Sequence, residues 1–387
     1  MTPLTRGAFA AVALALAALP AAAQGAQPGE TAAFVVTIGN DTLAVEKYTR
    51  TADRITGDLV SRSPRTVLRH YTAYLNPDGS VRRIEMTSSS PGTTQPTVTA
   101  ATDFTADSAF TRVTRNDSVF GFRVAASHPV PMVNYSHVFY EQAMMSARAA
   151  RLDTATLALV PLGSNQTYAL KVSAAGADSM RLENLSGVQH VATDARGRLL
   201  YLNGMESTQK FIVHRVPDVD VDAYAAEFAR RDAARQGMGP LSPRDSAVAD
   251  IGGARVSIDY GRPFKRGRVI FGNVVPWGEV WRTGANAATG FTTTRDLVIG
   301  GVAVPAGRYT LWSLPSESGW KLIVNRETGQ WGTEYHEEQD LARIDMQTRR
   351  LDTPVEEFTI KLDPAETGGV LRLQWDDVEA LVPITLK

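Results

Sequence analysis

The residues best suited to chemistry in this 387-residue sequence lie in one stretch, from Tyr260 to Asn286. This stretch carries five cationic side chains among five glycines and two tryptophans. Guanidinium groups bind carboxylate or phosphate at two points, indole rings offer flat faces for stacking, and glycines let backbone N–H groups approach an anion. The pattern therefore predicts a binding site for an anionic or sugar-like ligand, formed by Arg262, Lys265, Arg268, Trp281, Arg282 and Asn286.

The same residue types also have an internal interpretation. The arginines could tie loops to Glu279, to Asp259 or to backbone carbonyls, and Trp281 could belong to the hydrophobic core. Structural ion-pair networks have the same composition as binding sites, so the sequence leaves both interpretations open.

A second cluster places one histidine beside carboxylates, in Tyr335-His-Glu-Glu338 with Asp340 nearby. Such a group can bind a metal or act as a general base, but its spacing matches no established zinc pattern. The sequence also lacks a nucleophile elbow, a phosphate-binding loop and a dinucleotide fingerprint. We therefore predict no catalytic residue, metal or cofactor. A hydrolase-type enzyme that uses His336 and a carboxylate, or a structural adaptor, is the alternative to a binding protein.

Composition and the N-terminus predict an exported protein of a bacterial envelope, periplasmic or extracellular. Arg6 precedes an apolar run from Ala8 to Leu19, and Ala21-Ala-Ala23 resembles a cleavage site, so residues 1–23 read as a signal peptide. No later segment reads as transmembrane. The sequence has no cysteine and a net charge of −1, and it shows no basic stripe that would bind nucleic acid. The expected partner is a small molecule, a glycan or a lipid.

Hydrophobic periodicity predicts a mainly β protein in two parts. Residues 32–215 alternate as short strands around one helix from Ser136 to Arg151, with Ser136 as its N-cap. We expect a curved antiparallel sheet, or half-barrel, with the helix packed on its concave face. Residues 216–240 read as a linker helix and a break, and residues 241–387 as an antiparallel β-sandwich with an irregular insertion from Gly329 to Arg350.

The C-terminal part resembles a known family, the bacterial domain of unknown function numbered 2911. The resemblance covers about residues 240–380 and is carried by Ser242-Pro-Arg244, Tyr260-Gly-Arg-Pro263, Lys265 with Gly267-Arg268, Trp281-Arg-Thr-Gly-Ala-Asn286, Pro305-Ala-Gly307 before Tyr309-Thr-Leu311, and Trp320 with Asn325. It implies a compact β-domain of exported bacterial proteins, with no established activity.

The order of elements in residues 32–215 resembles the half-barrel of periplasmic lipoprotein carriers, in pattern only. That resemblance implies an apolar pocket between sheet and helix, which could hold an apolar ligand. A filled core with no cavity is the alternative, because an aromatic and methionine stripe on a helix usually packs against a sheet.

Overall fold

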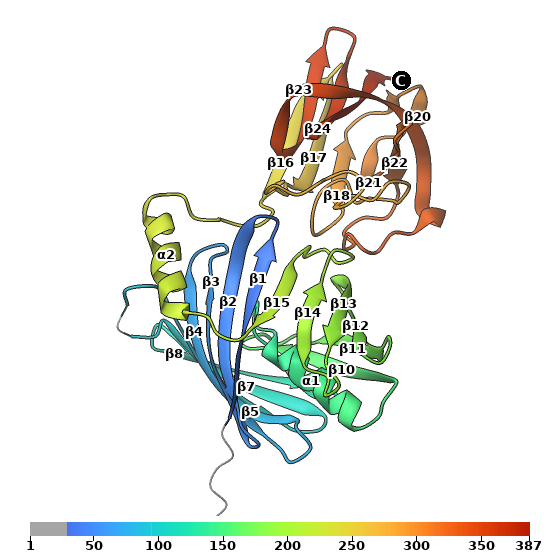
Figure 1. The fold of residues 1–387 in the computed structure, drawn as a ribbon. Helices are drawn as coiled ribbons and strands as arrows, with labels where there is room; N and C mark the ends of the chain where they lie inside the picture. The colour runs from blue at the N-terminus through green and yellow to red at the C-terminus, as the bar shows by residue number, and fades with distance from the viewer. Residues whose placement is uncertain (1–28, 94) are drawn as a thin grey trace, which may run out of the picture.

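The computed structural model describes residues 29–93 and 95–387, and the predicted signal peptide lies outside them. Two sheets, antiparallel apart from one parallel strand pair, and two α-helices make up the described fold, which confirms the predicted mainly β class (Figure 1). The helix α2 (Val221–Ala233) belongs to the segment that joins the two sheets.

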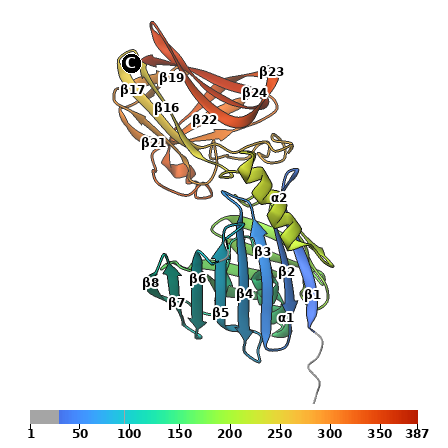
Figure 2. The ribbon, with the colours of Figure 1, turned by 90° about the vertical axis from the view of Figure 1, so that its left-hand side faces the viewer.

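The first sheet has fifteen strands and curls around α1 (Val138–Ala149). Its spatial order is β8 to β1 and then β15 down to β9, so almost every strand pairs with its neighbour in sequence. Figure 2 shows β8 to β1 side by side in one layer. The strands are β1 (Glu30–Ile38), β2 (Asp41–Arg50), β3 (Arg54–Ser61), β4 (Val67–Leu75), β5 (Val81–Ser89), β6 (Val98–Phe104), β7 (Ser108–Arg115), β8 (Ser118–Ala125), β9 (Pro129–Met132), β10 (Thr154–Pro161), β11 (Tyr168–Ala174), β12 (Ser179–Asn184), β13 (Gly187–Thr193), β14 (Leu199–Asn203) and β15 (Ile212–Val216).

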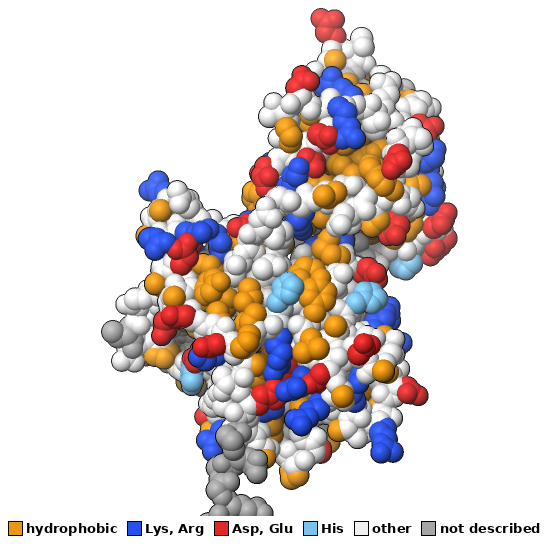
Figure 3. Space-filling model, viewed as in Figure 1, with side chains coloured by type: hydrophobic (Ala, Val, Ile, Leu, Met, Phe, Trp, Pro, Cys, Tyr) orange, Lys and Arg blue, Asp and Glu red, His pale blue; other side chains and the backbone are white. Residues whose placement is uncertain are grey.

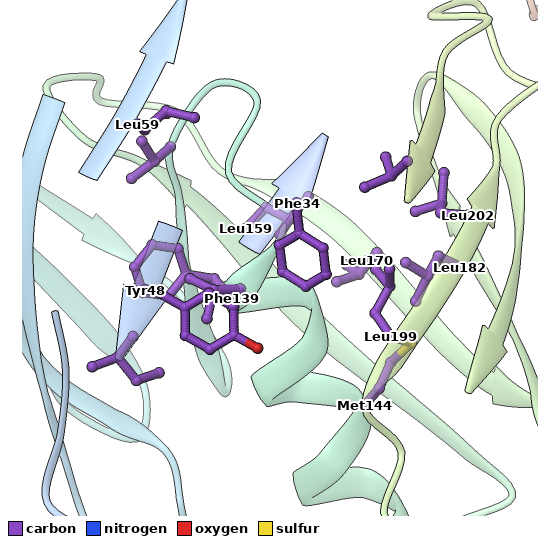
Figure 4. Close-up of a cluster of buried hydrophobic side chains, with 14 of the residues drawn as sticks. Phe34, Tyr48, Leu59, Phe139, Met144, Leu159, Leu170, Leu182, Leu199 and Leu202 are labelled. Atoms are coloured by element: carbon purple, nitrogen blue, oxygen red, sulfur yellow. The ribbon is translucent and has the colours of Figure 1, made fainter. Parts of the chain in front are cut away.

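Side chains from both arms of this sheet, β1–β8 and β9–β15, meet α1 in one core. Phe34 and Tyr48 come from the central strands, Leu182 from the far arm, and Phe139 and Met144 from the helix (Figure 4). All five are at most 2% exposed. Burial of a large apolar side chain contributes about 1.5–3 kcal/mol, so this cluster holds the helix inside the curve of the sheet.

Two buried glutamates fix α1 to the sheet. Glu46 of β2 accepts the backbone N–H groups of His137 and Val138 at 2.7 and 3.3 Å, which satisfies the start of the helix. It also accepts the Ser136 hydroxyl at 2.5 Å. The predicted cap by Ser136 is therefore wrong, since the capping group is a carboxylate from a distant strand. A fourth hydrogen bond comes from the Tyr71 hydroxyl at 2.6 Å. Burial raises the pKa of Glu46, and the four hydrogen bonds oppose that effect.

Glu141 is the second anchor and lies on the side of α1 that faces the sheet. Its carboxylate accepts from Arg50 at 2.7 Å, from Arg215 at 2.6 Å and from Tyr48 at 2.5 Å. It also accepts the backbone N–H of Leu199 at 2.8 Å. A fully buried carboxylate with two arginine partners is compensated, whereas the same group with one partner removed is costly.

The second sheet has nine strands, in the order β16-β17-β18-β21-β22-β23-β24-β19-β20. The long strand β23 pairs with β22 through its first residues and with β24 through the rest, with register shifts after Arg350 and Val355. This bend folds the sheet over an aromatic core. The strands are β16 (Arg244–Ile251), β17 (Ala254–Gly261), β18 (Thr289–Thr293), β19 (Leu297–Ile299), β20 (Val302–Val304), β21 (Gly307–Leu314), β22 (Trp320–Asn325), β23 (Asp340–Ala365) and β24 (Gly368–Leu386), with a short 3₁₀ turn at Glu337–Gln339.

The predicted insertion from Gly329 to Arg350 is only partly irregular. Its second half begins β23 at Asp340, where Ile344 and Met346 are buried and Asp345 between them is exposed. Of the eleven residues from Asp340 to Arg350, only Ile344 and Met346 are buried, and this alternation is too short to indicate a strand.

The two sheets touch directly as well as through the linker. Arg266 of the second sheet forms an ion pair with Asp41 at 3.2 Å, and its carbonyl accepts the backbone N–H of Asn40 at 3.1 Å. The Thr333 hydroxyl donates to the carbonyl of Leu185 at 3.2 Å. Helix α2 packs on β2 and β3 of the first sheet through its apolar face.

Candidate functional site

A cavity of about 840 Å³ lies between the two sheets, and we call it the inter-sheet cavity. The first sheet contributes its β14–β15 loop and the end of β1. The second sheet contributes the loop between β17 and β18, where the predicted cationic residues lie. The aromatic part of its wall comes from Trp281, Trp312, Trp375, Tyr335 and Phe211. The volume is that of a typical small-molecule site.

Four of the six predicted ligand-binding residues line this cavity: Arg268, Trp281, Arg282 and Asn286. Trp281 fixes the geometry of the loop. Its backbone exchanges two hydrogen bonds of 2.8 Å with Ser313, and its ring stacks on Trp375 with centroids 5.9 Å apart. Trp281 is therefore both core and cavity wall, so the two interpretations of this residue are compatible.

Arg282 follows Trp281 and has no hydrogen-bond or ion-pair partner among residues 29–93 and 95–387. Its Nε atom is fully buried, and its aliphatic part lies against Gly332, where a Cβ would collide with Arg282 Cδ. Burial alone lowers the pKa of this guanidinium to about 10. A desolvated guanidinium whose terminal N–H groups have no partner among the described residues is a strong site for a carboxylate or phosphate.

Arg268 has used part of its donor set within its own loop. Its Nε donates to the carbonyl of Lys265 at 3.0 Å, and a terminal nitrogen donates to the carbonyl of Phe264. Burial, followed by the nearby charge of Arg266, lowers the pKa of Arg268 to about 10. One terminal nitrogen stays free of these contacts.

Lys210 is the third cation of the cavity and comes from the first sheet. Its ammonium group donates to the carbonyl of Met205 within the β14–β15 loop. Burial, together with the charges of Arg282 and Arg268, lowers its pKa to about 8. Its φ of 55° lies in the left-handed region, which is costly for a side chain of this kind. Such strain persists where the surrounding structure holds it in place and gathers at functional sites.

Asn286 lies across the cavity from the first sheet, also in the left-handed region with φ 64°. Asparagine tolerates this conformation better than most residues. Its backbone carbonyl accepts the N–H of Gly332 at 2.9 Å. The residue lines the cavity, and its side-chain amide forms no hydrogen bond with the described residues.

Arg262 and Lys265 do not line the inter-sheet cavity. Arg262 forms ion pairs with Asp245 at 2.8 Å and with Glu357 at 3.0 Å, and Lys265 forms one with Asp376. These contacts match the internal interpretation of the sequence. Arg266, as described, ties the two sheets together.

Figure 3 shows cationic and acidic side chains interspersed over one face of the molecule, without a single large basic patch. The concentration of positive charge at the inter-sheet cavity is therefore local. Glu206 and Glu279 also line the cavity and limit its net charge.

Lys210 had no signal in the sequence. It is a single lysine in a polar loop, and it meets Arg282 only because the sheets pack together. A sequence argument could have found it only by knowing the order of the two sheets in space.

Of the histidine cluster, Tyr335 lines the inter-sheet cavity, whereas His336 and the carboxylates do not. His336 Nδ1 is 2.7 Å from Glu327 on an exposed loop, and this partner raises the pKa of His336. Asp340 accepts from Tyr335 at 2.7 Å and from Arg343 at 2.8 Å, so it ties the loop to β23. Among the described residues, no three His, Asp or Glu side chains come together as a metal site.

A second cavity, of about 530 Å³, opens beside α1 and we call it the helix cavity. Its lining is mainly apolar and includes Phe104, Phe139, Ala143 and Leu157. Gln142 donates to the carbonyl of Gly79 at 2.8 Å, while its buried side-chain oxygen has no partner among the described residues.

No helix in the described part of the chain is long and apolar enough to cross a membrane.

Comparison with known families agrees with the C-terminal resemblance. The family model described as a protein of unknown function (DUF2911) matches residues 242–384, which confirms the predicted family and its place in the chain. No curated protein matches the sequence.

Two solved structures show a limited likeness to this chain. One is a DUF1089-family protein from Pseudomonas aeruginosa, with 10% identity, a TM-score of 0.31, and coverage of 42% of this chain and 90% of the other. The second is a β-barrel-like protein of domain of unknown function DUF1849 from Brucella abortus, with 8% identity, a TM-score of 0.32, and coverage of 49% and 96%.

Proposed function

We propose that this protein is an exported, non-catalytic binding protein of the bacterial envelope, and that it holds a small organic anion in the inter-sheet cavity. Arg282 is the observation that carries this proposal. Its guanidinium is desolvated, borders a cavity of about 840 Å³ and has no partner among the described residues. Burial of an unpaired charge costs free energy, which a bound carboxylate or phosphate would offset.

The surroundings of Arg282 define the ligand further. Arg268 and Lys210 add positive charge, and Trp281, which is 8% exposed, adds a small apolar surface. The carboxylates of Glu206 and Glu279, which also line the cavity, can accept hydrogen bonds from the hydroxyl groups of a ligand. A sugar-sized acid combines the three properties of negative charge, a flat face and hydroxyl donors. Export is supported by the signal-peptide pattern of residues 1–23.

Glucuronate and glucose test the site, because they share a ring and differ in charge. We expect glucuronate to raise the melting temperature of the wild-type protein, and glucose to leave it unchanged. Arg282→Met should abolish the glucuronate effect. Arg308→Met removes the same charge from an exposed position of β21 and should preserve it.

The outcome that contradicts the proposal is an equal response of wild type and Arg282→Met to glucuronate, citrate and inorganic phosphate. Native mass spectrometry of protein purified from its own envelope fraction would then identify what, if anything, is retained. A retained sugar acid or other small anion that is absent from Arg282→Met supports the cavity site.

The helix cavity favours a second candidate function, the binding of an apolar ligand by the first sheet. Its wall is mainly apolar, and the unpaired oxygen of Gln142 offers one acceptor for a ligand hydroxyl or amide. Ala143→Leu fills this cavity, and Ala149→Leu adds the same bulk on the exposed side of α1. An environment-sensitive naphthyl dye should bind wild type and Ala149→Leu, and bind Ala143→Leu at least several-fold more weakly. Equal binding by all three proteins would exclude the cavity as an apolar site.

A further inference from the structure

We propose that Lys210 is a reactive amine, which captures small acids bearing an aldehyde or ketone by forming an imine inside the inter-sheet cavity. The inference rests on the proposed anion site, because the acid group of such a compound would lie on Arg282. It adds a covalent chemistry that neither the binding proposal nor the family match contains.

The placement of the amine is the first support. All seven lysines of the sequence lie in the described residues, and Lys210 is the one that lines this cavity. Its nitrogen donates to the carbonyl of Met205, and a neutral amine that donates one N–H keeps its lone pair for attack on carbon. The backbone at Lys210 is in the left-handed region, a costly conformation that persists where the surrounding structure holds it and that gathers at functional sites.

The charges around Lys210 are the second support. Arg282 and Arg268 face the amine from the second sheet and disfavour its protonated form, while Glu279 and Glu206 act in the opposite direction. With burial as the largest cause, the pKa of Lys210 falls from 10.5 to about 8. At pH 7 this change raises the neutral, nucleophilic fraction by about 300-fold.

The chemistry balances without an oxidant or reductant. The nitrogen lone pair forms a bond to the carbonyl carbon while the C=O π bond breaks, and proton transfer gives a carbinolamine. The nitrogen lone pair then expels the hydroxyl group, which takes up a proton and leaves as water. Loss of the remaining N–H proton gives the neutral imine, and Arg282 pairs with the carboxylate of the bound compound.

Reductive trapping tests the inference on the full-length mature protein. Glyoxylate is added at pH 7 with cyanoborohydride, which reduces an imine to a stable carboxymethyl amine, and the modified lysines are mapped by peptide mass spectrometry. We expect labelling of Lys210 at least about tenfold faster than that of the exposed Lys171 and Lys361, with a pH midpoint near 8. Lysine residues in one chain serve as controls for one another, so folding of a variant does not affect this comparison.

Two further reagents separate the imine from the anion site. Propanal lacks the acid group, so Arg282→Met should slow its reaction with Lys210 only through the loss of the charge that lowers the pKa of the amine. Labelling by glyoxylate also loses the carboxylate partner and should slow several-fold more than labelling by propanal. If Lys210 reacts no faster than Lys171 while glucuronate still stabilises the protein through Arg282, the imine proposal is wrong and the binding proposal stands. If Lys210 reacts rapidly but Arg282→Met slows both reagents equally, the amine is reactive and the anion site is wrong.

Discussion

Replacement of Arg282 by methionine should make the empty protein more stable and abolish anion binding. Methionine has a similar length and can keep the packing on Gly332, and the described residues provide no hydrogen bond or ion pair that would be lost. The change removes a charge that burial disfavours. A binding arginine without a partner in the empty cavity lowers the stability of the empty protein, so its removal should raise stability and abolish binding.

The magnitude follows from the lowered pKa of Arg282. A fall from 12.5 to about 10 corresponds to about 3.4 kcal/mol of penalty for the charged form. Solvent in the open cavity screens this charge, so we take about 2 kcal/mol as the gain on substitution. For a domain of about 150–250 residues, a gain of about 2 kcal/mol corresponds to a rise in melting temperature of about 4–8 °C.

The assay is thermal unfolding in a buffer of low ionic strength, with and without glucuronate. Wild type should melt below Arg282→Met in the absence of the anion. At a glucuronate concentration of one hundred times Kd, wild type should gain about 2.7 kcal/mol and the variant nothing, so the order of stability reverses. Arg308→Met should behave as wild type in both conditions. A clear fall in the melting temperature of Arg282→Met without ligand would refute the reasoning, since it would make Arg282 a stabilising part of the fold.

Three more predictions follow from buried groups. Gly332→Ala places a methyl group against Arg282 Cδ and the Asn286 carbonyl, so it should weaken glucuronate binding and cost about 1–3 kcal/mol, whereas Gly290→Ala, with only an ordinary contact, should retain binding. Glu141→Gln leaves Arg50 and Arg215 without their buried carboxylate and should cost about 3–5 kcal/mol in urea unfolding, against little change for the exposed Glu85→Gln; a cost below 1 kcal/mol would contradict the role of this anchor. Burial lowers the pKa of His137 to about 4, below the ordinary 6.5, so its contribution to stability is full above pH 6.5 and falls as the pH drops toward 4. The loss is about 2 kcal/mol at pH 5, so His137→Phe should lose less stability than wild type between pH 7 and pH 5 by this amount. An equal loss in both proteins would show that His137 does not titrate in this range.

The sequence predicts local features of this protein well. Strand periodicity and turn residues indicated two mainly β parts and a helix between two runs of strands, because those signals depend on neighbours in the chain. The start of α1 shows the limit. Ser136 has the residue type of an N-cap, but the helix N–H groups bind Glu46, ninety residues earlier in the chain. Only the curvature of the sheet brings that carboxylate to the helix.

The cationic loop shows the same limit at the site. Its composition indicated a concentration of charge, but not which cations would be neutralised. The acids that pair with Arg262 and Lys265 are Asp245, Glu357 and Asp376, which lie on strands far from the loop in sequence. Arg282 differs because it forms no ion pair with any described acidic residue. Pairing in space therefore separates the structural cations from the candidate binding cations.

The inter-sheet cavity gives a physical reason for the two sheets to share one chain. Arg282 and Arg268 come from the second sheet and Lys210 from the first, so neither sheet alone assembles the three cations. Free association of two separate chains would cost about 4–15 kcal/mol in lost translational and rotational freedom. Here α2 packs on the first sheet and Arg266 of the second sheet pairs with Asp41 of the first, so the wall positions are set before a ligand arrives. A cavity set in this way can hold like charges close together, because separation of the walls would break the packing and ion pairs that join the two sheets.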